Sequence, residues 1–96
     1  MDNREDWQLC KVNGDHWNGM FHRPTRTYFK IEGNAAWVVA QLEPMYARWE
    51  RELAKYAVRR FWSGDFSGAK AIRISGNLEP YRIIRVALPR LHGPVM

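Results

Sequence analysis

Cysteine and histidine side chains are the first residues in this chain whose chemistry would suit a metal site. The candidates are Cys10, His16, His22 and His92. Zinc sites draw Cys and His ligands from closely spaced pairs, whereas five residues separate each neighbouring pair among the first three candidates. That spacing matches no zinc pattern, so we predict no metal site and assign these side chains to a buried thiol and surface imidazoles.

Cys10, with Asp15 and His16, also supplies the residue types of a nucleophile, an orienting carboxylate and a base. Nothing in the sequence brings the three together, and a cysteine on a half-buried strand usually serves packing. The chain also lacks a glycine-rich phosphate-binding motif. We therefore predict a binding protein without catalytic residues or cofactor, and keep a small Cys/His-dependent enzyme as the second alternative.

Basic and aromatic side chains carry the remaining signal. The chain has a net charge of +5 and five tryptophans, and Trp, Tyr and Arg dominate binding hot spots. Positive charge favours anionic partners. The candidates for binding a partner or nucleic acid are Trp7, Trp17, Arg23, Arg26, Arg51, Lys55, Arg59, Arg60, Trp62, Arg73, Tyr81, Arg82 and Arg85. The competing interpretation is that the tryptophans fill the core and the cations form a solvated surface.

An amino-terminal hairpin is the first element expected to position these residues. Residues 7–12 alternate between apolar and polar, and Asn13-Gly14 is a strong turn signal. The return strand is expected over 16–22. A two-residue loop would put Cys10 opposite Trp17, whereas a four-residue loop would put Val12 there, and the sequence leaves both open. Residues 27–32 alternate as a third strand.

The segment 34–64 has helical periodicity, with Asn34 as the expected N-cap and Gly64 as the stop. Pro44 would kink this helix or divide it in two, and we favour the division. The stripe expected to be buried comprises Met45, Trp49, Leu53, Tyr56 and Phe61.

Two further strands are expected over 70–75 and 81–88, with a hairpin signal at Gly76-Asn77 and an irregular tail over 89–96. The sequence thus predicts one α+β domain over 1–96 with a flexible start at 1–6. Its antiparallel sheet of about five strands, in the order β-β-β-α-α-β-β along the chain, would pack on a central helix broken or kinked at Pro44.

The expected location is the cytoplasm. No apolar run reaches the roughly 18–20 residues that span a bilayer, and the polar start does not resemble a signal peptide. A single cysteine fits a reducing compartment. We expect no membrane partner, and the sequence does not fix the oligomeric state.

In size, charge and aromatic content the chain resembles the small accessory proteins of bacteriophages and mobile elements. This resemblance implies a protein that docks on a host nucleic-acid-processing complex, such as a nuclease, helicase or polymerase, and modulates or inhibits it. The first alternative is a protein that binds DNA or RNA directly, with strand and helix cations on phosphates and aromatic rings on bases.

Overall fold

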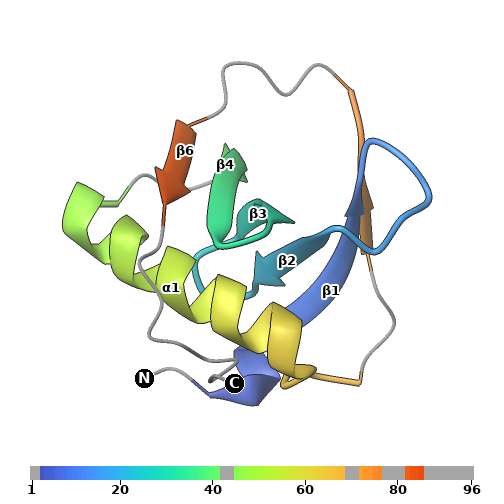
Figure 1. Cartoon of the computed structure of the whole chain (residues 1–96), viewed down its shortest axis with the longest axis horizontal. Helices are drawn as coiled ribbons and strands as arrows, with labels where there is room; N and C mark the ends of the chain where they lie inside the picture. The colour runs from blue at the N-terminus through green and yellow to red at the C-terminus, as the bar shows by residue number, and fades with distance from the viewer. Residues whose placement is uncertain (1–2, 42–44, 69–71, 77–81, 86–96) are drawn as a thin grey trace, which may run out of the picture.

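The computed structural model describes residues 3–41, 45–68 and 72–76, and the backbone of 82–85. Their elements are a 3-10 turn at Arg4–Asp6, β1 (Trp7–Val12), β2 (Gly19–His22), β3 (Thr27–Glu32), β4 (Ala35–Gln41), α1 (Ala47–Ser63), β5 (Ile72–Ile74) and β6 (Arg82–Arg85). The strands form one sheet in the order β5-β1-β2-β3-β4-β6, and α1 packs against it (Figure 1). The predicted α+β class is confirmed.

The first hairpin has the register of the four-residue-loop alternative, because Trp7 opposite His22 is the same alignment as Val12 opposite Trp17. Cys10 lies opposite Gly19, and β2 begins at Gly19 rather than at residue 16. Asn18 accounts for the difference: its Oδ1 accepts a 2.8 Å hydrogen bond from the Val12 N–H, and its Nδ2 donates to the Val12 carbonyl at 3.2 Å. This side chain takes the place of a backbone partner, so the loop is longer than the Asn-Gly signal indicated.

The segment Ala35–Gln41 is a strand, and the helix predicted to begin at Asn34 is wrong there. Gly33 adopts a positive φ of 57°, which allows a tight turn that brings β4 back antiparallel to β3. Val38 and Val39 suit a strand because their β-branched side chains pack well on a pleated surface. Pro44 lies outside the described residues. It separates β4 from α1 in sequence and does not break a continuous helix.

The last two strands lie at opposite edges of the sheet, so the hairpin predicted at Gly76-Asn77 is also wrong. β5 pairs parallel with β1, and β6 pairs antiparallel with β4, which makes the sheet mixed rather than antiparallel. Asn13 holds β5 in place: its N–H donates to the Ile74 carbonyl at 2.8 Å, and its Oδ1 accepts from the Gly76 N–H at 2.9 Å.

Small side chains form the centre of the interface between α1 and the sheet. Ala54, Ala57 and Val58 are fully buried in one cluster with Trp7 and Phe29. Their spacing marks one side of the helix, and short side chains let the helix backbone approach the strands. The buried side is therefore rotated from the aromatic stripe that the sequence predicted. Of that stripe, Leu53, Tyr56 and Phe61 are partly buried at its borders.

The opposite face of the sheet carries a second cluster formed by Cys10, Val12 and Val39. Figure 1 shows the strands in an arc with β5 and β6 at its ends and α1 outside the arc. The second cluster consequently lies on the face turned away from α1. None of the described helical segments is long and apolar enough to cross a lipid bilayer.

The carboxyl-terminal end of α1 is held by several contacts. Gly64 closes α1 in the left-handed conformation, as predicted, with its N–H bonded to the Arg60 carbonyl. Beyond it, Asp65 accepts from Arg60 at 2.6 Å and from Arg4 at 3.1 Å. Arg4 belongs to the 3-10 turn within the start for which flexibility was expected, and it also donates to the carbonyl of Phe66 at 2.7 Å.

Candidate binding surface

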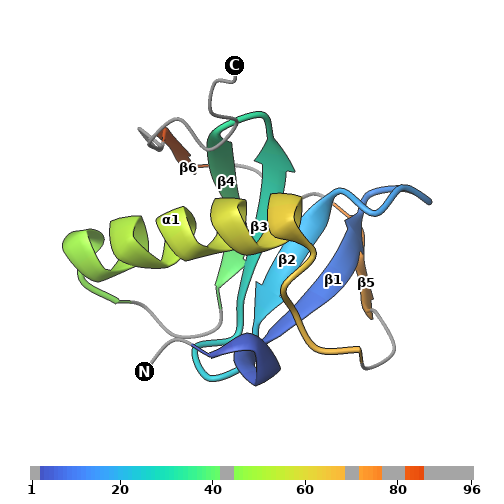
Figure 2. The same cartoon turned by 60° about the horizontal axis from the view of Figure 1, so that its bottom comes forward.

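The amino-terminal end of α1 extends past β4 in both views of the fold (Figures 1 and 2). Six of the seven residues over 46–52 are exposed, and Glu50 is the buried one. The fully buried residues of α1 begin only at Ala54. The first two turns of the helix therefore present most of their side chains to solvent.

One side of this end is aromatic. Tyr46 and Trp49 are 74% and 56% exposed, and their rings pack edge to face with centroids 5.8 Å apart. Leu53 and Tyr56 continue the same side of the helix, because steps of three or four residues return to one side. We call these four residues the aromatic flank. It runs from the exposed ring pair down to side chains that pack against the core.

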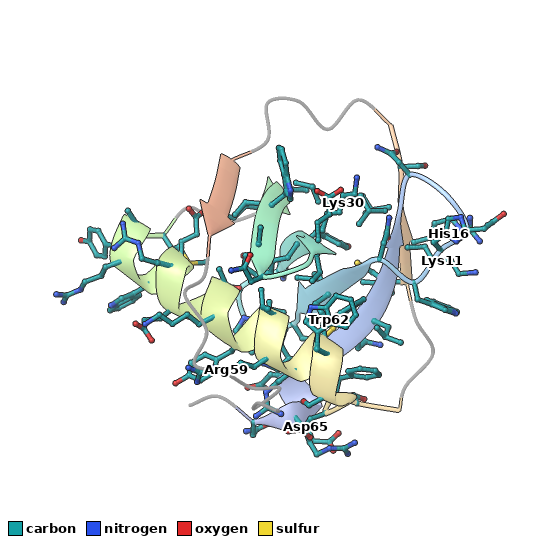
Figure 3. All side chains as sticks on the ribbon, in the orientation of Figure 1. Lys11, His16, Lys30, Arg59, Trp62 and Asp65 are labelled. Carbon is teal, nitrogen blue, oxygen red and sulfur yellow. The ribbon has the colours of Figure 1, made fainter. Side chains whose placement is uncertain are left out.

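A different side of α1 is basic. Arg48, Arg51, Lys55 and Arg59 follow one another at steps of three or four residues and span about 16 Å along the helix axis. Trp62 comes three residues later on the same side. We call these five residues the basic flank, and Figure 3 labels Arg59 and Trp62 on its carboxyl-terminal half.

Three of these cations have no carboxylate against them among the described side chains. Lys55 pairs with Glu52 at 3.1 Å. Within the part of the chain that the structure describes, Arg48, Arg51 and Arg59 form no ion pair, and all three are exposed. The basic flank therefore carries uncompensated positive charge.

Trp62 is 56% exposed yet held in place. Its Nε1–H donates a 2.7 Å hydrogen bond to the carbonyl of Gly33 in the turn between β3 and β4. The Phe61 and Trp62 rings lie nearly perpendicular to each other, with centroids 4.9 Å apart. These two contacts therefore hold the exposed indole in one orientation.

Two of the other predicted aromatic residues do not join this surface. Trp7 has no exposed area and belongs to the core, so we leave it out of the binding surface. Trp17 is half exposed in the loop between β1 and β2, where Lys11 Nζ lies 4.2 Å from its ring centroid. Tyr81 lies outside the described residues.

Two of the predicted cations are engaged in ion pairs elsewhere. Arg60 is mostly buried against Asp65 at 2.6 Å, which is a contact that closes the helix end. Arg73 forms a 2.7 Å pair with Asp15, and this guanidinium lowers the pKa of the Asp15 carboxyl below its usual value. Any cation on a protein surface can form such an ion pair, so these contacts are structural.

The remaining predicted cations lie away from α1 in the sequence. Arg23 and Arg26 are exposed in the turn between β2 and β3, where Arg23 donates to the Glu5 carbonyl at 3.3 Å. Arg82 and Arg85 lie in β6, for which the structure describes the backbone alone. Of the thirteen predicted residues, the structure aligns Arg51, Lys55, Arg59 and Trp62 along one side of α1.

Three exposed residues at the start of α1 were not predicted as part of the binding surface. Tyr46 and Arg48 were not among the candidates, and Trp49 was assigned to the buried stripe. Arg48 had a readable signal, because it begins the three- and four-residue steps that lead to Arg51, Lys55 and Arg59. For Trp49 the signal was a second apolar series on α1, formed by Ala54, Ala57 and Val58. When that series is the buried side of the helix, the Trp49 ring is exposed to solvent.

The Cys and His candidates do not converge. Cys10 packs in the cluster on the face away from α1, and burial raises the pKa of its thiol to about 12. The thiol is therefore protonated near neutral pH. His22 is buried against the Trp7 ring, which belongs to the core beneath α1, and His16 is exposed in a loop. No three His, Cys, Asp or Glu side chains gather as metal ligands within the described residues, and His92 lies outside them.

No protein-family model, curated protein or solved structure matches this chain. The exposed surface of α1 is therefore the feature from which a function can be inferred.

Proposed function

We propose that this chain is a non-enzymatic binding protein that docks, through the aromatic flank of α1, on a protein of a larger nucleic-acid-processing complex and modulates or inhibits that complex. The observation that supports the proposal is the Tyr46–Trp49 pair, with exposures of 74% and 56% at the projecting end of the helix. Two large neighbouring rings in water are typical of a hot spot that a partner covers.

The pair is also suited to binding with little loss of entropy. Tyr46 and Trp49 already pack edge to face, so a partner would meet a partly ordered surface rather than two freely rotating side chains. Leu53 and Tyr56 extend the apolar strip toward the core. A helix that offers residues at these steps fits a hydrophobic groove on the partner.

Charge supports an anionic partner rather than a second copy of the chain. Arg48 and Arg51 lie in the same two turns as the ring pair and have no carboxylate partner within the described residues. A second copy would bring four like charges to the contact, which opposes association. With a net charge of +5, the chain is attracted to complexes that carry nucleic acid or expose acidic surfaces.

The test is affinity capture with the full tagged chain from a bacterial lysate treated with nuclease, followed by mass spectrometry and binding measurements on the purified partner. We expect a nuclease, helicase or polymerase subunit. The double variant Tyr46→Ser/Trp49→Ser should weaken its binding by at least about 30-fold, which corresponds to one hot spot of about 2 kcal/mol.

Trp17→Ser is the matched control, because it removes an exposed indole from a different part of the molecule. It should leave the affinity within about threefold. Equal binding by the double variant and the wild type would contradict the proposal. A captured set unrelated to nucleic-acid processing would contradict the proposed class of partner.

A further inference from the structure

We propose that the basic flank of α1 binds single-stranded nucleic acid, with its arginines on the phosphate backbone and Trp62 stacked on an unpaired base. The site lies on a different side of the helix from the aromatic flank. It therefore adds a direct nucleic-acid contact to the docking function and does not depend on it.

The first support is where the uncompensated charge lies. Elsewhere in the described chain several cations are bound to carboxylates: Arg4, Lys30, Arg60 and Arg73. Arg48, Arg51 and Arg59 have no such partner among the residues that the structure describes. A guanidinium group without a carboxylate keeps its donors available for phosphate oxygens, which it binds with two parallel hydrogen bonds.

The second support is the alignment of these charges. A rise of 1.5 Å per residue separates Arg48, Arg51, Lys55 and Arg59 by about 4.5 to 6 Å along the axis. A row of cations about 16 Å long can follow a phosphate backbone, whereas a scattered set would neutralise one phosphate at a time. Glu52, the acidic neighbour of this row, is already paired with Lys55 at 3.1 Å.

The third support is the state of Trp62 at the end of the row. Its one hydrogen-bond donor is used on the Gly33 carbonyl at 2.7 Å, so the exposed ring has its π-face to offer a ligand. Stacking on a base uses that face and tolerates any base. The bases of a duplex are already stacked on one another, so the ring favours an unpaired strand.

Other occupants fit less well. A second copy would set one row of arginines against another. An acidic protein would satisfy the charges, but nothing in its carboxylates would use the oriented indole. A duplex offers phosphates without an accessible base face. The last two alternatives become outcomes of the experiment.

The experiment is fluorescence anisotropy of a labelled single-stranded DNA of about 20 nucleotides with the full chain, at about 50 and 200 mM salt. With three to four phosphates neutralised, the slope of log K against log salt should lie between about −2 and −3, so that binding weakens roughly 15- to 60-fold. The variant Arg51→Gln/Arg59→Gln should reduce the steepness of this slope by about 1.4.

Trp62→Leu should weaken binding about 5- to 100-fold at either salt concentration, since it removes one stacking ring. Trp62→Phe keeps a smaller ring but loses the hydrogen bond to Gly33, and should fall between Leu and the wild type. Urea unfolding curves of all variants confirm that the affinities refer to folded protein.

The matched control is Arg23→Gln/Arg26→Gln, which removes the same charge from the turn between β2 and β3. It should weaken binding less than about threefold, and Tyr46→Ser/Trp49→Ser should leave it unchanged. No binding at low salt, or equal losses from the two arginine double variants, would overturn the proposal. Equal affinity for a duplex of the same length would overturn the single-strand site. Competition by polyglutamate as strong as by unlabelled single strand would show an acidic-protein site instead.

Discussion

Gln41, the last residue of β4, donates a 2.9 Å hydrogen bond from its Nε2 to Oε2 of Glu50 in the first turn of α1. Glu50 is only 7% exposed, although it is a carboxylate near a helix end that projects into solvent. The contact joins the sheet to the helix just before the fully buried part of α1 begins. It therefore helps to set the direction in which Tyr46 and Trp49 are presented.

Loss of this contact should reduce stability measurably. We expect Gln41→Ala to lower the free energy of unfolding by about 1.5 to 3 kcal/mol, because it removes a donor from a buried charged acceptor. Glu50→Gln keeps a neutral hydrogen bond and should cost less. Urea denaturation measures both, with exposed Glu52→Gln as the control, expected within about 0.5 kcal/mol of wild type. A Gln41→Ala protein as stable as the wild type would show that the contact contributes nothing.

Gly19 should tolerate no side chain. A Cβ there would lie 2.6 Å from the Phe29 carbonyl oxygen and 2.8 Å from Cys10 Sγ. The first neighbour is backbone in the adjacent strand and cannot move aside without disturbing the sheet. We expect Gly19→Ala to lower the free energy of unfolding by about 3 kcal/mol, the upper end of overpacking costs.

Gly14→Ala is the control for this substitution, since a Cβ at Gly14 meets nothing within 4 Å and its φ is not positive. Its unfolding midpoint in urea should stay close to that of the wild type. Comparable losses from the two substitutions would show that glycine flexibility, rather than the close approach at Gly19, sets the cost.

Strands with a clear apolar–polar alternation were predictable from the sequence, including their first and last residues. Trp7–Val12 and Thr27–Glu32 alternate between apolar and polar, and the structure has strands with these bounds. Ala35–Gln41 was not predictable in this way, because its alanines and valines suit either a helix or a buried strand. The tight turn at Gly33 and pairing with β3 decide the outcome, and both depend on contacts that a helical pattern cannot report.

Strand pairing between segments that are distant in sequence was the second feature that could not be predicted. The hairpin signal at Gly76-Asn77 describes only the local chain, whereas β5 and β6 pair with the two free edges of the sheet formed by β1 to β4. The candidate surface was affected in a similar way. The charges of α1 were recognised, but the rotation of the helix on the sheet, which exposes Trp49, depends on how closely Ala54 and Ala57 approach the strands.

The buried thiol of Cys10 should make stability depend on alkaline pH. Burial raises its pKa from 9.0 to about 12, so the unfolded chain loses this proton at lower pH than the folded chain does. The contribution is complete below about pH 9 and declines between pH 9 and about 12, by up to about 1.4 kcal/mol for each pH unit.

Cys10→Ala isolates this effect from other groups that titrate at high pH. The wild type should be the more stable protein near pH 8, and its advantage in unfolding free energy should shrink by about 2 kcal/mol by about pH 10.5. Urea denaturation of both proteins at the two pH values measures the change. A constant difference between them would mean that the folded thiol ionises as readily as the unfolded one.

Two tryptophans with opposite surroundings should respond differently to truncation. Trp7 has no exposed area and contacts the His22 and Phe29 rings, so Trp7→Ala should cost about 3 to 5 kcal/mol of unfolding free energy. Trp49 is 56% exposed and beyond the buried side of α1. Trp49→Ser should change stability by no more than about 0.5 kcal/mol in the isolated chain.

The comparison also tests the basis of the docking proposal, because a binding residue need not contribute to folding. Chemical denaturation gives the two stabilities, and quenching of tryptophan fluorescence by acrylamide gives the accessibility of the rings. Replacement of Trp49 should remove part of the quenchable emission, since its ring is open to the quencher. If Trp49→Ser instead destabilised the fold as much as Trp7→Ala, Trp49 would be a structural residue. A loss of partner binding in the Trp49 variant would then be explained by unfolding and would not be evidence for a docking site.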